Sequence, residues 1–269
     1  MPIPNGIQIP NALVEDVRQR RAVLFAGAGM SFPSLGILAS HIRDAIGSEI
    51  QRDYAEYDFG LRTLEDVCDE YVALNDRITL VNRLAAAIPQ GAIPTPSHVE
   101  AVKAFRFIIT TNWDLLFEAA YRQIGQGYNV LSSNEDAPNF TYDQHNLLKI
   151  HGSVDRPLTL IATSEDYEGY AYTHGLLLDR VYELLNNNTA LFVGYGLRDH
   201  HIRQLLTRIR LTRGVWARKA YAVGYFDRVR TRLLDRRNIE AIQVLGGTDE
   251  IGSGLEEILP ELINRAGIH

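Results

Sequence analysis

Short apolar runs alternate with longer amphipathic stretches along most of the chain, and this alternation predicts strands separated by helices. The runs are rich in β-branched and aromatic residues, which is typical of strands buried on both faces of a parallel sheet. They lie at residues 23–25, 107–110, 147–150, 158–162, 190–194, 219–223 and 239–244. We therefore predict an α/β fold with a parallel sheet flanked by helices.

One long segment breaks the alternation. Residues 34–105 carry helical periodicity and contain no convincing strand run. Thr63 and Asp66 have the spacing of a helix capping box, and Ser97 is placed to start another helix. We predict a helical insertion after the first strand and helix, at about residues 45–100.

The length of the chain is that of a single domain. A chain of 269 residues can form one α/β domain with a full core, so we predict a single domain over residues 1–269. The stretch 126–146 is rich in Gly, Asn, Asp and Pro and predicts a loop. Residues 249–265 predict an amphipathic final helix.

Four of the predicted strands run directly into polar or glycine-rich turns. They read VLFAGAGMS at 23–31, FIITTNWD at 107–114, LLKIHGS at 147–153 and ALFVGYGLRD at 190–199. Because ligands bind outside the carboxyl ends of the strands in open parallel sheets, we expect these four turns to converge. Together they predict one nucleotide pocket.

The first turn, Gly27-Ala28-Gly29, has almost no side-chain bulk, so its backbone N–H groups can approach a phosphate closely. Ser31 can either cap the following helix or donate its hydroxyl to a phosphate. The alternative is an ordinary strand-to-helix turn in which glycine serves only the backbone geometry. Phe32 breaks the G-x-G-x-x-G spacing, so the turn is not the dehydrogenase fingerprint.

The second and third turns carry the polar side chains. Asn112 offers a donor and an acceptor on one amide, which suits ribose hydroxyls, although it can also serve as a simple turn residue. Trp113 is bulky enough to wall a base-sized pocket, and Asp114 can alternatively cap a helix. His151 sits at a strand end before a glycine, where a general base would be placed. Most of the other histidines lie on helix-like or loop segments, where a solvated surface role is expected; they are His41, His98, His145, His174, His200, His201 and His269.

The chain resembles the sirtuin family, and in particular the divergent sirtuin-like domains of bacterial defence proteins, in four ordered motifs: Gly27-Ala28-Gly29-x-Ser31, Thr111-Asn112-Trp113-Asp114, His151-Gly152 and Gly194-Tyr195-Gly196. The resemblance spans about residues 22–225 and implies a Rossmann-like sheet that binds NAD. It implies that Asn112 contacts the nicotinamide ribose, that Asp114 contacts the carboxamide and that His151 is the base, so these three are the expected catalytic residues. The residues expected to hold NAD are Ala26, Gly27, Ala28, Gly29, Ser31, Thr111, Asn112, Trp113, Asp114, His151, Gly194, Tyr195 and Gly196.

Departures from the family pattern narrow the expected activity. Protein-deacylating sirtuins carry a four-cysteine zinc module, whereas Cys68 is the one cysteine in this chain, so no zinc or other metal is expected. The segment that clamps an acyl-lysine peptide is also missing after Pro157. We therefore expect an NAD+ glycohydrolase that uses water as acceptor and yields nicotinamide and ADP-ribose, as an NAD-depleting effector in anti-phage defence. The alternatives are an NAD-dependent protein deacylase or ADP-ribosyltransferase, and a non-catalytic sensor of NAD or ADP-ribose.

Charge is unevenly distributed along a chain whose net charge is −6. Residues 198–237 hold twelve lysines and arginines against three acids, and residues 44–76 hold ten acids against two basic residues. One interpretation is that both segments form solvated helix faces. The other is that the basic segment pairs with the acidic segment, within a chain or between subunits, and this interpretation predicts a homo-oligomer. Direct nucleic-acid binding ranks last because base-stacking aromatics are sparse.

Location and partners follow from what the sequence lacks. No apolar run reaches the length of a transmembrane helix, and the first ten residues do not resemble a secretory signal. One cysteine allows no disulfide framework, so we expect a cytoplasmic protein without membrane contact. No sensor segment is apparent, and the resemblance implies control by self-assembly, by a ring-forming helicase-like ATPase or by another sensor protein.

Overall fold

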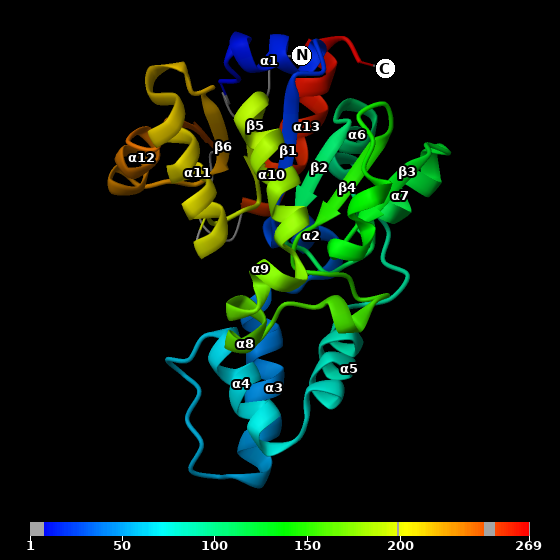
Figure 1. The fold of residues 1–269 in the computed structure, drawn as a ribbon, viewed down its shortest axis with the longest axis vertical. Helices are drawn as coiled ribbons and strands as arrows, with labels where there is room; N and C mark the ends of the chain where they lie inside the picture. Colours follow the sequence, from blue (N-terminus) through cyan, green and yellow to red (C-terminus); the bar gives the residue numbers. More distant parts are fainter. Residues whose placement is uncertain (1–7, 198, 245–250, 269) are drawn as a thin grey trace.

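A seven-stranded parallel sheet forms the centre of the computed structural model, which describes residues 8–197, 199–244 and 251–268 (Figure 1). The strand order is β3-β4-β2-β1-β5-β6-β7, so the chain starts in the middle of the sheet and builds outward on both sides. The strands are β1 Ala22–Ala26, β2 Phe107–Thr110, β3 Tyr128–Leu131, β4 His145–Lys149, β5 Thr189–Val193, β6 Ala220–Gly224 and β7 Ile239–Gln243.

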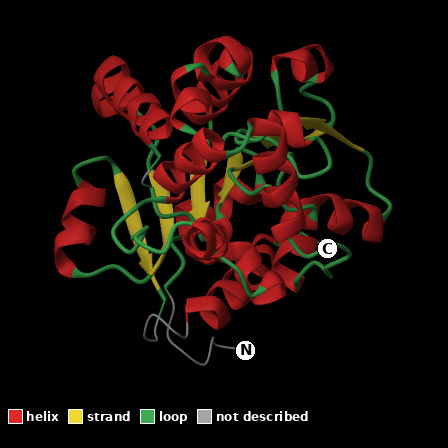
Figure 2. Cartoon of the chain, turned by 90° about the horizontal axis from the view of Figure 1, so that it is seen from below, coloured by secondary structure: helices red, strands yellow, loops and turns green. Residues whose placement is uncertain are grey.

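Helices cover both faces of this sheet, as Figure 2 shows. One face packs against α1 (Asn11–Arg18), α6 (Pro96–Ala104), α7 (Leu116–Ile124) and α13 (Ile251–Ala266), and the other packs against α10 (Gly175–Asn187), α11 (His200–Arg213) and α12 (Arg228–Asp235). Along β1, Leu24 enters the first core, whereas Val23 and Phe25 enter the second. Burial on both faces explains why these strands are almost wholly apolar.

Most of the predicted strands are confirmed, but the one at 158–162 is wrong. That segment forms a short 3-10 turn, Pro157–Thr159, followed by extended chain outside the sheet. Leu160 is fully buried in a separate helical core, and the Ile161 N–H donates to the carbonyl of His151 at 3.1 Å. The apolar run is explained by burial against helices rather than by strand pairing.

The predicted loop at 126–146 is also wrong in part, because it contains the edge strand β3 and a 3-10 helix, Asn134–Asn139. Val130 pairs with Leu147 of β4, and the ring of Tyr128 stacks on Tyr121 of α7 with centroids 4.3 Å apart. An edge strand has one neighbour and needs little apolar sequence, so its composition looked like that of a loop.

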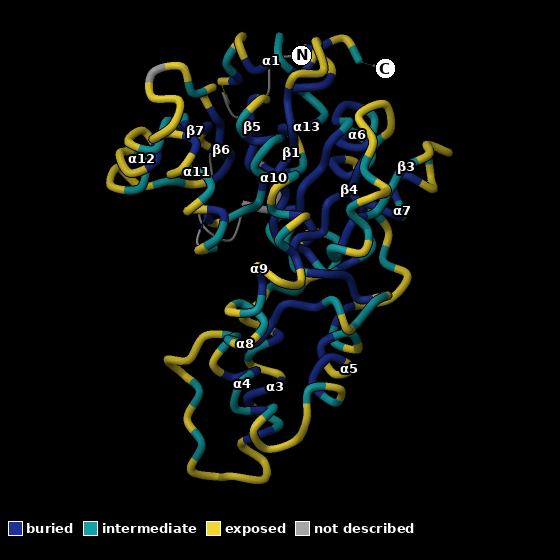
Figure 3. Tube along the Cα trace, in the orientation of Figure 1, coloured by how far each residue is buried: buried dark blue, intermediate teal, exposed yellow. Residues whose placement is uncertain are grey.

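The predicted helical insertion is present as three helices, α3 (Ala39–Asp53), α4 (Leu64–Leu74) and α5 (Arg77–Ala87), which follow α2 (Ala28–Leu35). They enclose a hydrophobic core together with Val154, Leu160 and Ala162, and Figure 3 marks buried residues along these helices. The capping box of Thr63 and Asp66 begins α4 as predicted. The helix predicted to start at Ser97 is present as α6, which begins one residue earlier, at Pro96, while the Ser97 hydroxyl donates to the Glu256 carbonyl of α13.

The insertion lies beyond the carboxyl ends of the strands (Figure 1). Two short helices, α8 (Ser164–Glu168) and α9 (Tyr170–Thr173), lie between it and the sheet. The four sequence motifs follow strand ends, so they lie where the sheet meets the helical insertion. The final helix is confirmed as α13, although residues 249 and 250 of its predicted range lie outside the described residues.

Candidate active site at the carboxyl edge of the sheet

The first and fourth motifs interlock through their backbones. Gly27 donates its N–H to the Val193 carbonyl at 3.0 Å, and Gly29 donates to the Gly194 carbonyl at 2.9 Å. A Cβ on Gly27 would lie 2.6 Å from the Gly194 oxygen, and Gly194 itself has a φ of +62°. Close approach of two backbones therefore requires these glycines. The N–H groups of Gly27 and Gly29, which were expected to approach a phosphate, therefore bond to carbonyl groups of the protein itself.

Asn112 joins the second motif to the first. Its amide nitrogen donates to the Gly27 carbonyl at 3.1 Å and to the Ser31 hydroxyl at 2.9 Å. Its Oδ1 atom is buried and has no hydrogen-bond partner. Ser31 lies inside α2, whose N-cap is Gly27, so its predicted capping alternative is wrong. The arrangement fixes the orientation of Asn112 and leaves its Oδ1 acceptor without a hydrogen-bond partner in the protein.

The two residues after Asn112 face different surroundings. The Trp113 side chain packs against the core of the insertion, and its buried Nε1 has no hydrogen-bond partner. Asp114 is buried, and its Oδ1 accepts the N–H of Leu116 at 3.0 Å, just before α7 begins. Capping is therefore one role of Asp114, which leaves its second oxygen for other partners.

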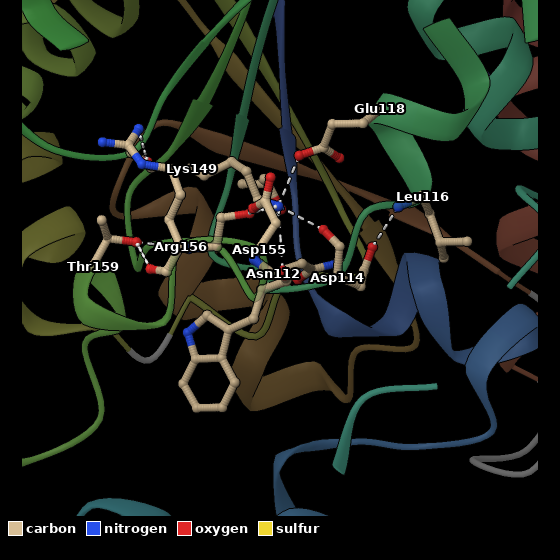
Figure 4. Close-up of polar contacts among 12 residues, drawn as sticks. Asn112, Asp114, Leu116, Glu118, Lys149, Asp155, Arg156 and Thr159 are labelled. Atoms are coloured by element: carbon tan, nitrogen blue, oxygen red, sulfur yellow. Dashed lines mark hydrogen bonds and ion pairs between the residues drawn. The ribbon is translucent and has the colours of Figure 1, made fainter. Parts of the chain in front are cut away.

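A buried lysine ties the second motif to the third (Figure 4). The Lys149 ammonium donates to the Asp114 carbonyl at 2.6 Å, to Glu118 Oε1 at 2.9 Å and to the Ser153 hydroxyl at 2.7 Å. The Trp113 carbonyl is also within reach, at 3.2 Å. Burial raises the pKa of Glu118. Sequence reasoning missed this pair, and its signal was a lysine inside the apolar run LLKI.

His151 joins the third motif to the fourth. Its Nε2 lies 2.9 Å from Oδ2 of Asp199, and both side chains are mostly buried. Burial raises the pKa of Asp199, but the hydrogen bond and charge of His151, together with the Ile202 N–H, outweigh it and lower that pKa to about 2. Asp199 was not among the predicted site residues. Its signal was an aspartate that ends the fourth motif just before a helix.

The remaining predicted residues take supporting positions. Ala26 ends β1, and Ala28 is the first residue of α2. Thr111 donates its N–H to the Ala26 carbonyl at 3.4 Å. The Tyr195 ring packs on Phe25 with centroids 4.5 Å apart, and its buried hydroxyl has no partner. Gly196 accepts a hydrogen bond from Arg230 through its carbonyl.

The four predicted motifs thus form a closed ring of contacts across β4, β2, β1 and β5. Among the residues that the structure describes, no group of three or more His, Cys, Asp or Glu side chains is arranged to hold a metal ion. Buried polar atoms without a hydrogen-bond partner at this site belong to amide, indole and phenol groups, beside one histidine–carboxylate pair. Such a set suits a neutral or weakly charged polar ligand better than a metal.

A family model described as a SIR2-like domain matches residues 106–242. Defense-associated sirtuin 2 of Bacillus subtilis is 24% identical over 225 residues, which cover 77% of this chain and 21% of that protein. An NAD(+) hydrolase ThsA of Acinetobacter baumannii is 26% identical over 207 residues, covering 74% of this chain and 41% of the relative. The chain therefore spans between a fifth and two fifths of the length of these curated relatives.

Solved structures support the fold. A crystal structure of SIR2 bound to an inhibitor, 2'-O-acetyl-ADP-ribose and a deacetylated peptide superposes with a TM-score of 0.53 at 13% identity, covering 97% of this chain and 100% of that one. This likeness confirms the predicted Rossmann-like parallel sheet. The family match confirms the resemblance drawn from the four motifs.

Proposed function

Because the chain belongs to the SIR2-like domain family, we propose that it is an NAD+ hydrolase that cleaves the bond between nicotinamide and ribose. Several relatives are named NAD(+) hydrolases, and another is named a defense-associated sirtuin. We further propose that the domain depletes NAD as an effector in anti-phage defence. The products are nicotinamide and ADP-ribose.

The observation that carries the proposal is the pairing of an oriented amide with a histidine on adjacent strand ends. Thr110, the last residue of β2, pairs with Lys149, the last residue of β4, and Asn112 and His151 each lie two residues beyond these strand ends. Asn112 is held from one side by Gly27 and Ser31, so its unpaired Oδ1 is available to a ribose hydroxyl. Positioning of a sugar requires a fixed polar group such as the Asn112 amide, and removal of a proton requires a base such as the His151 imidazole.

The proposed reaction needs little acid catalysis. The bond between C1′ and the pyridinium nitrogen breaks, and both electrons go to that nitrogen, so nicotinamide leaves as a neutral molecule. The water oxygen bonds to C1′, and a water proton passes to His151 and then to solvent. Asn112 positions the ribose, and the second oxygen of Asp114 orients the carboxamide. The partial positive charge at the N-terminus of α2 attracts the phosphates, and the first motif and the turn at Gly194–Gly196 together hold the phosphates and adenosine.

Incubating the purified protein with NAD alone tests this function. Release of nicotinamide and ADP-ribose supports hydrolysis, release only with an acylated peptide indicates a deacylase, and binding without turnover indicates a sensor. Asn112→Ala and His151→Ala should each abolish release while the melting temperature shows a folded protein. His200→Ala, an exposed histidine on α11, serves as the matched control and should keep activity.

We also propose a cytoplasmic homo-oligomer that is controlled by self-assembly, by a ring-forming helicase-like ATPase or by another sensor. Within the described part of the chain, no ion pair joins residues 44–76 to residues 199–237. The acids of the insertion pair locally instead, as Glu70 does with Arg62 at 2.7 Å. Charge pairing between subunits predicts that the oligomer dissociates at high salt in size-exclusion chromatography. None of the described helices is long and apolar enough to cross a bilayer.

A further inference from the structure

Asp199 has a fixed orientation because each of its carboxylate oxygens has a different partner. It is the N-cap of α11, where Oδ1 accepts the N–H of Ile202 at 3.0 Å. Oδ2 faces Nε2 of His151 at 2.9 Å. The side chains of Asp199 and His151 are only 6% and 12% exposed, so water competes little for this contact. A helix N-terminus further favours the ionised form of the carboxylate.

An ionised carboxylate accepts hydrogen bonds and cannot donate them. Nε2 of His151 must therefore carry the hydrogen in this contact, and in the neutral ring the free lone pair lies on Nδ1. Within the described residues, Nδ1 forms no hydrogen bond. The pair thus leaves one defined basic nitrogen, Nδ1 of His151, without a hydrogen bond among the described residues.

Two aromatic rings pack against the imidazole. Tyr167 of α8 and Tyr170 of α9 stand nearly perpendicular to the His151 ring, with centroids 5.6 and 6.4 Å away. His201 stacks on Tyr170 at 4.5 Å, and His174 stacks on the same ring at 4.9 Å. Burial raises the pKa values of both tyrosines and lowers those of both histidines, which favours their neutral forms. Among the described side chains that contact His151, Asp199 is therefore the charged group.

We propose that Asp199 is the positioning residue that holds His151 as the Nε2–H tautomer and leaves Nδ1 to accept the proton during NAD hydrolysis. This inference rests on the proposed function. As the water oxygen bonds to C1′ and nicotinamide departs with the bonding electrons, one water proton moves to Nδ1. The imidazolium that forms is stabilised by Asp199, which remains ionised, and the Nδ1 proton then passes to solvent.

Asp199→Asn is the informative substitution, because asparagine has the same size and is an equally good helix N-cap. We expect kcat to fall about 100-fold, within the usual range for general-base catalysis, with the KM for NAD unchanged. Loss of the carboxylate charge removes a stabiliser of the imidazolium, so the acidic limb of the pH–rate profile should move to lower pH. Asp199→Glu restores the charge and should recover part of the lost kcat.

A matched control is Asp76→Asn, which alters the capping aspartate of a different helix, α5, whose carboxylate bonds to Thr79. It should leave kcat and the pH profile unchanged. Wild-type kcat and an unshifted pH profile in Asp199→Asn would overturn the inference, as would an equal loss of activity in Asp76→Asn. A rise in kcat would also overturn it, since it would mean that Asp199 blocks His151.

A second measurement needs neither activity nor a variant at Asp199. Long-range nitrogen–proton NMR spectra of the ¹⁵N-histidine-labelled wild type, at a pH well above imidazole titration, report the tautomer of each ring. The His151 signals are assigned with His151→Gln, and we expect the Nε2–H form. An Nδ1–H form overturns the inference even if NAD is hydrolysed. Absence of nicotinamide release with an Nε2–H ring instead counts against the proposed function alone.

Discussion

Replacing Lys149 with methionine should destabilise the protein strongly, because the substitution removes the cation of a buried ion pair and keeps its anion. Lys149 is 1% exposed, and its ammonium donates to Glu118 and Ser153 and to the carbonyl of Asp114 (Figure 4). Methionine fills a similar volume but donates no hydrogen bond. Glu118 would be left in an apolar site, where its Oε2 already has no partner.

The size of the effect follows from the asymmetry of buried pairs. Removing one partner of a buried salt bridge costs about 3–5 kcal/mol, whereas replacing both partners with apolar groups is often close to neutral. With a shift of about 2–4 °C per kcal/mol for a large domain, the melting temperature should fall by about 6–20 °C. Lys149→Met combined with Glu118→Leu should recover much of that loss.

Urea unfolding of the two single variants and the double variant measures the coupling directly. Lys103→Met is the control, since Lys103 pairs with Glu100 at 2.7 Å in a partly exposed position and should cost less than about 1 kcal/mol. If Lys149→Met costs no more than the control, or if the double variant loses the sum of the single losses, the reasoning about an uncompensated Glu118 is refuted.

Two further predictions concern other contacts at this edge. In calorimetry, Gly194→Ala should lower the protein's stability more than Gly36→Ala. Both glycines have left-handed φ values, +62° and +68°, but a Cβ on Gly194 would lie 2.2 Å from the Met30 nitrogen, whereas a Cβ on Gly36 would meet nothing within 4 Å. Equal losses of stability would contradict the clash. The lowered pKa of Asp199, about 2, should add stability that is present above about pH 4, the pKa of an unfolded aspartate, and is lost as the pH falls toward 2. Acid titration of the unfolding free energy should therefore be shallower in Asp199→Asn, and identical slopes would argue against the pair.

The sequence predicted the strands whose burial on both sheet faces makes them apolar, and it predicted the helical insertion from its long helical periodicity. It could not tell what buries an apolar run, so Leu160 was assigned to a strand although it packs in the insertion. Composition likewise hid β3, since an edge strand can be polar. Periodicity describes which residues are buried, whereas the partner that buries them is decided by tertiary structure.

The two ion pairs of the site were missed for a related reason. Lys149 and Glu118 lie 31 positions apart, and His151 and Asp199 lie 48 apart, so neither pair leaves a local pattern. Each becomes visible only when the strand order places β4 beside β2 and the β5 loop near the third motif. The one member that sequence analysis singled out was His151, at a strand end before a glycine, whereas Lys149, a charge inside an apolar strand, was overlooked.

The glycines of the motifs therefore report on the fold, whereas the polar side chains of the motifs report on the chemistry. Gly27 and Gly29 were assigned to phosphate binding, yet their N–H groups bond to β5 and the following turn, and a Cβ on either would meet the Gly194 backbone. A substitution at either glycine would disturb the fold, and a loss of activity there would say little about NAD. Asn112 has an unpaired acceptor and Asp199 a fixed contact with His151, so conservative changes at these two residues alter chemistry while keeping shape. Tests of the proposed reaction belong at the side chains, because the glycine motifs report how two strand ends approach each other.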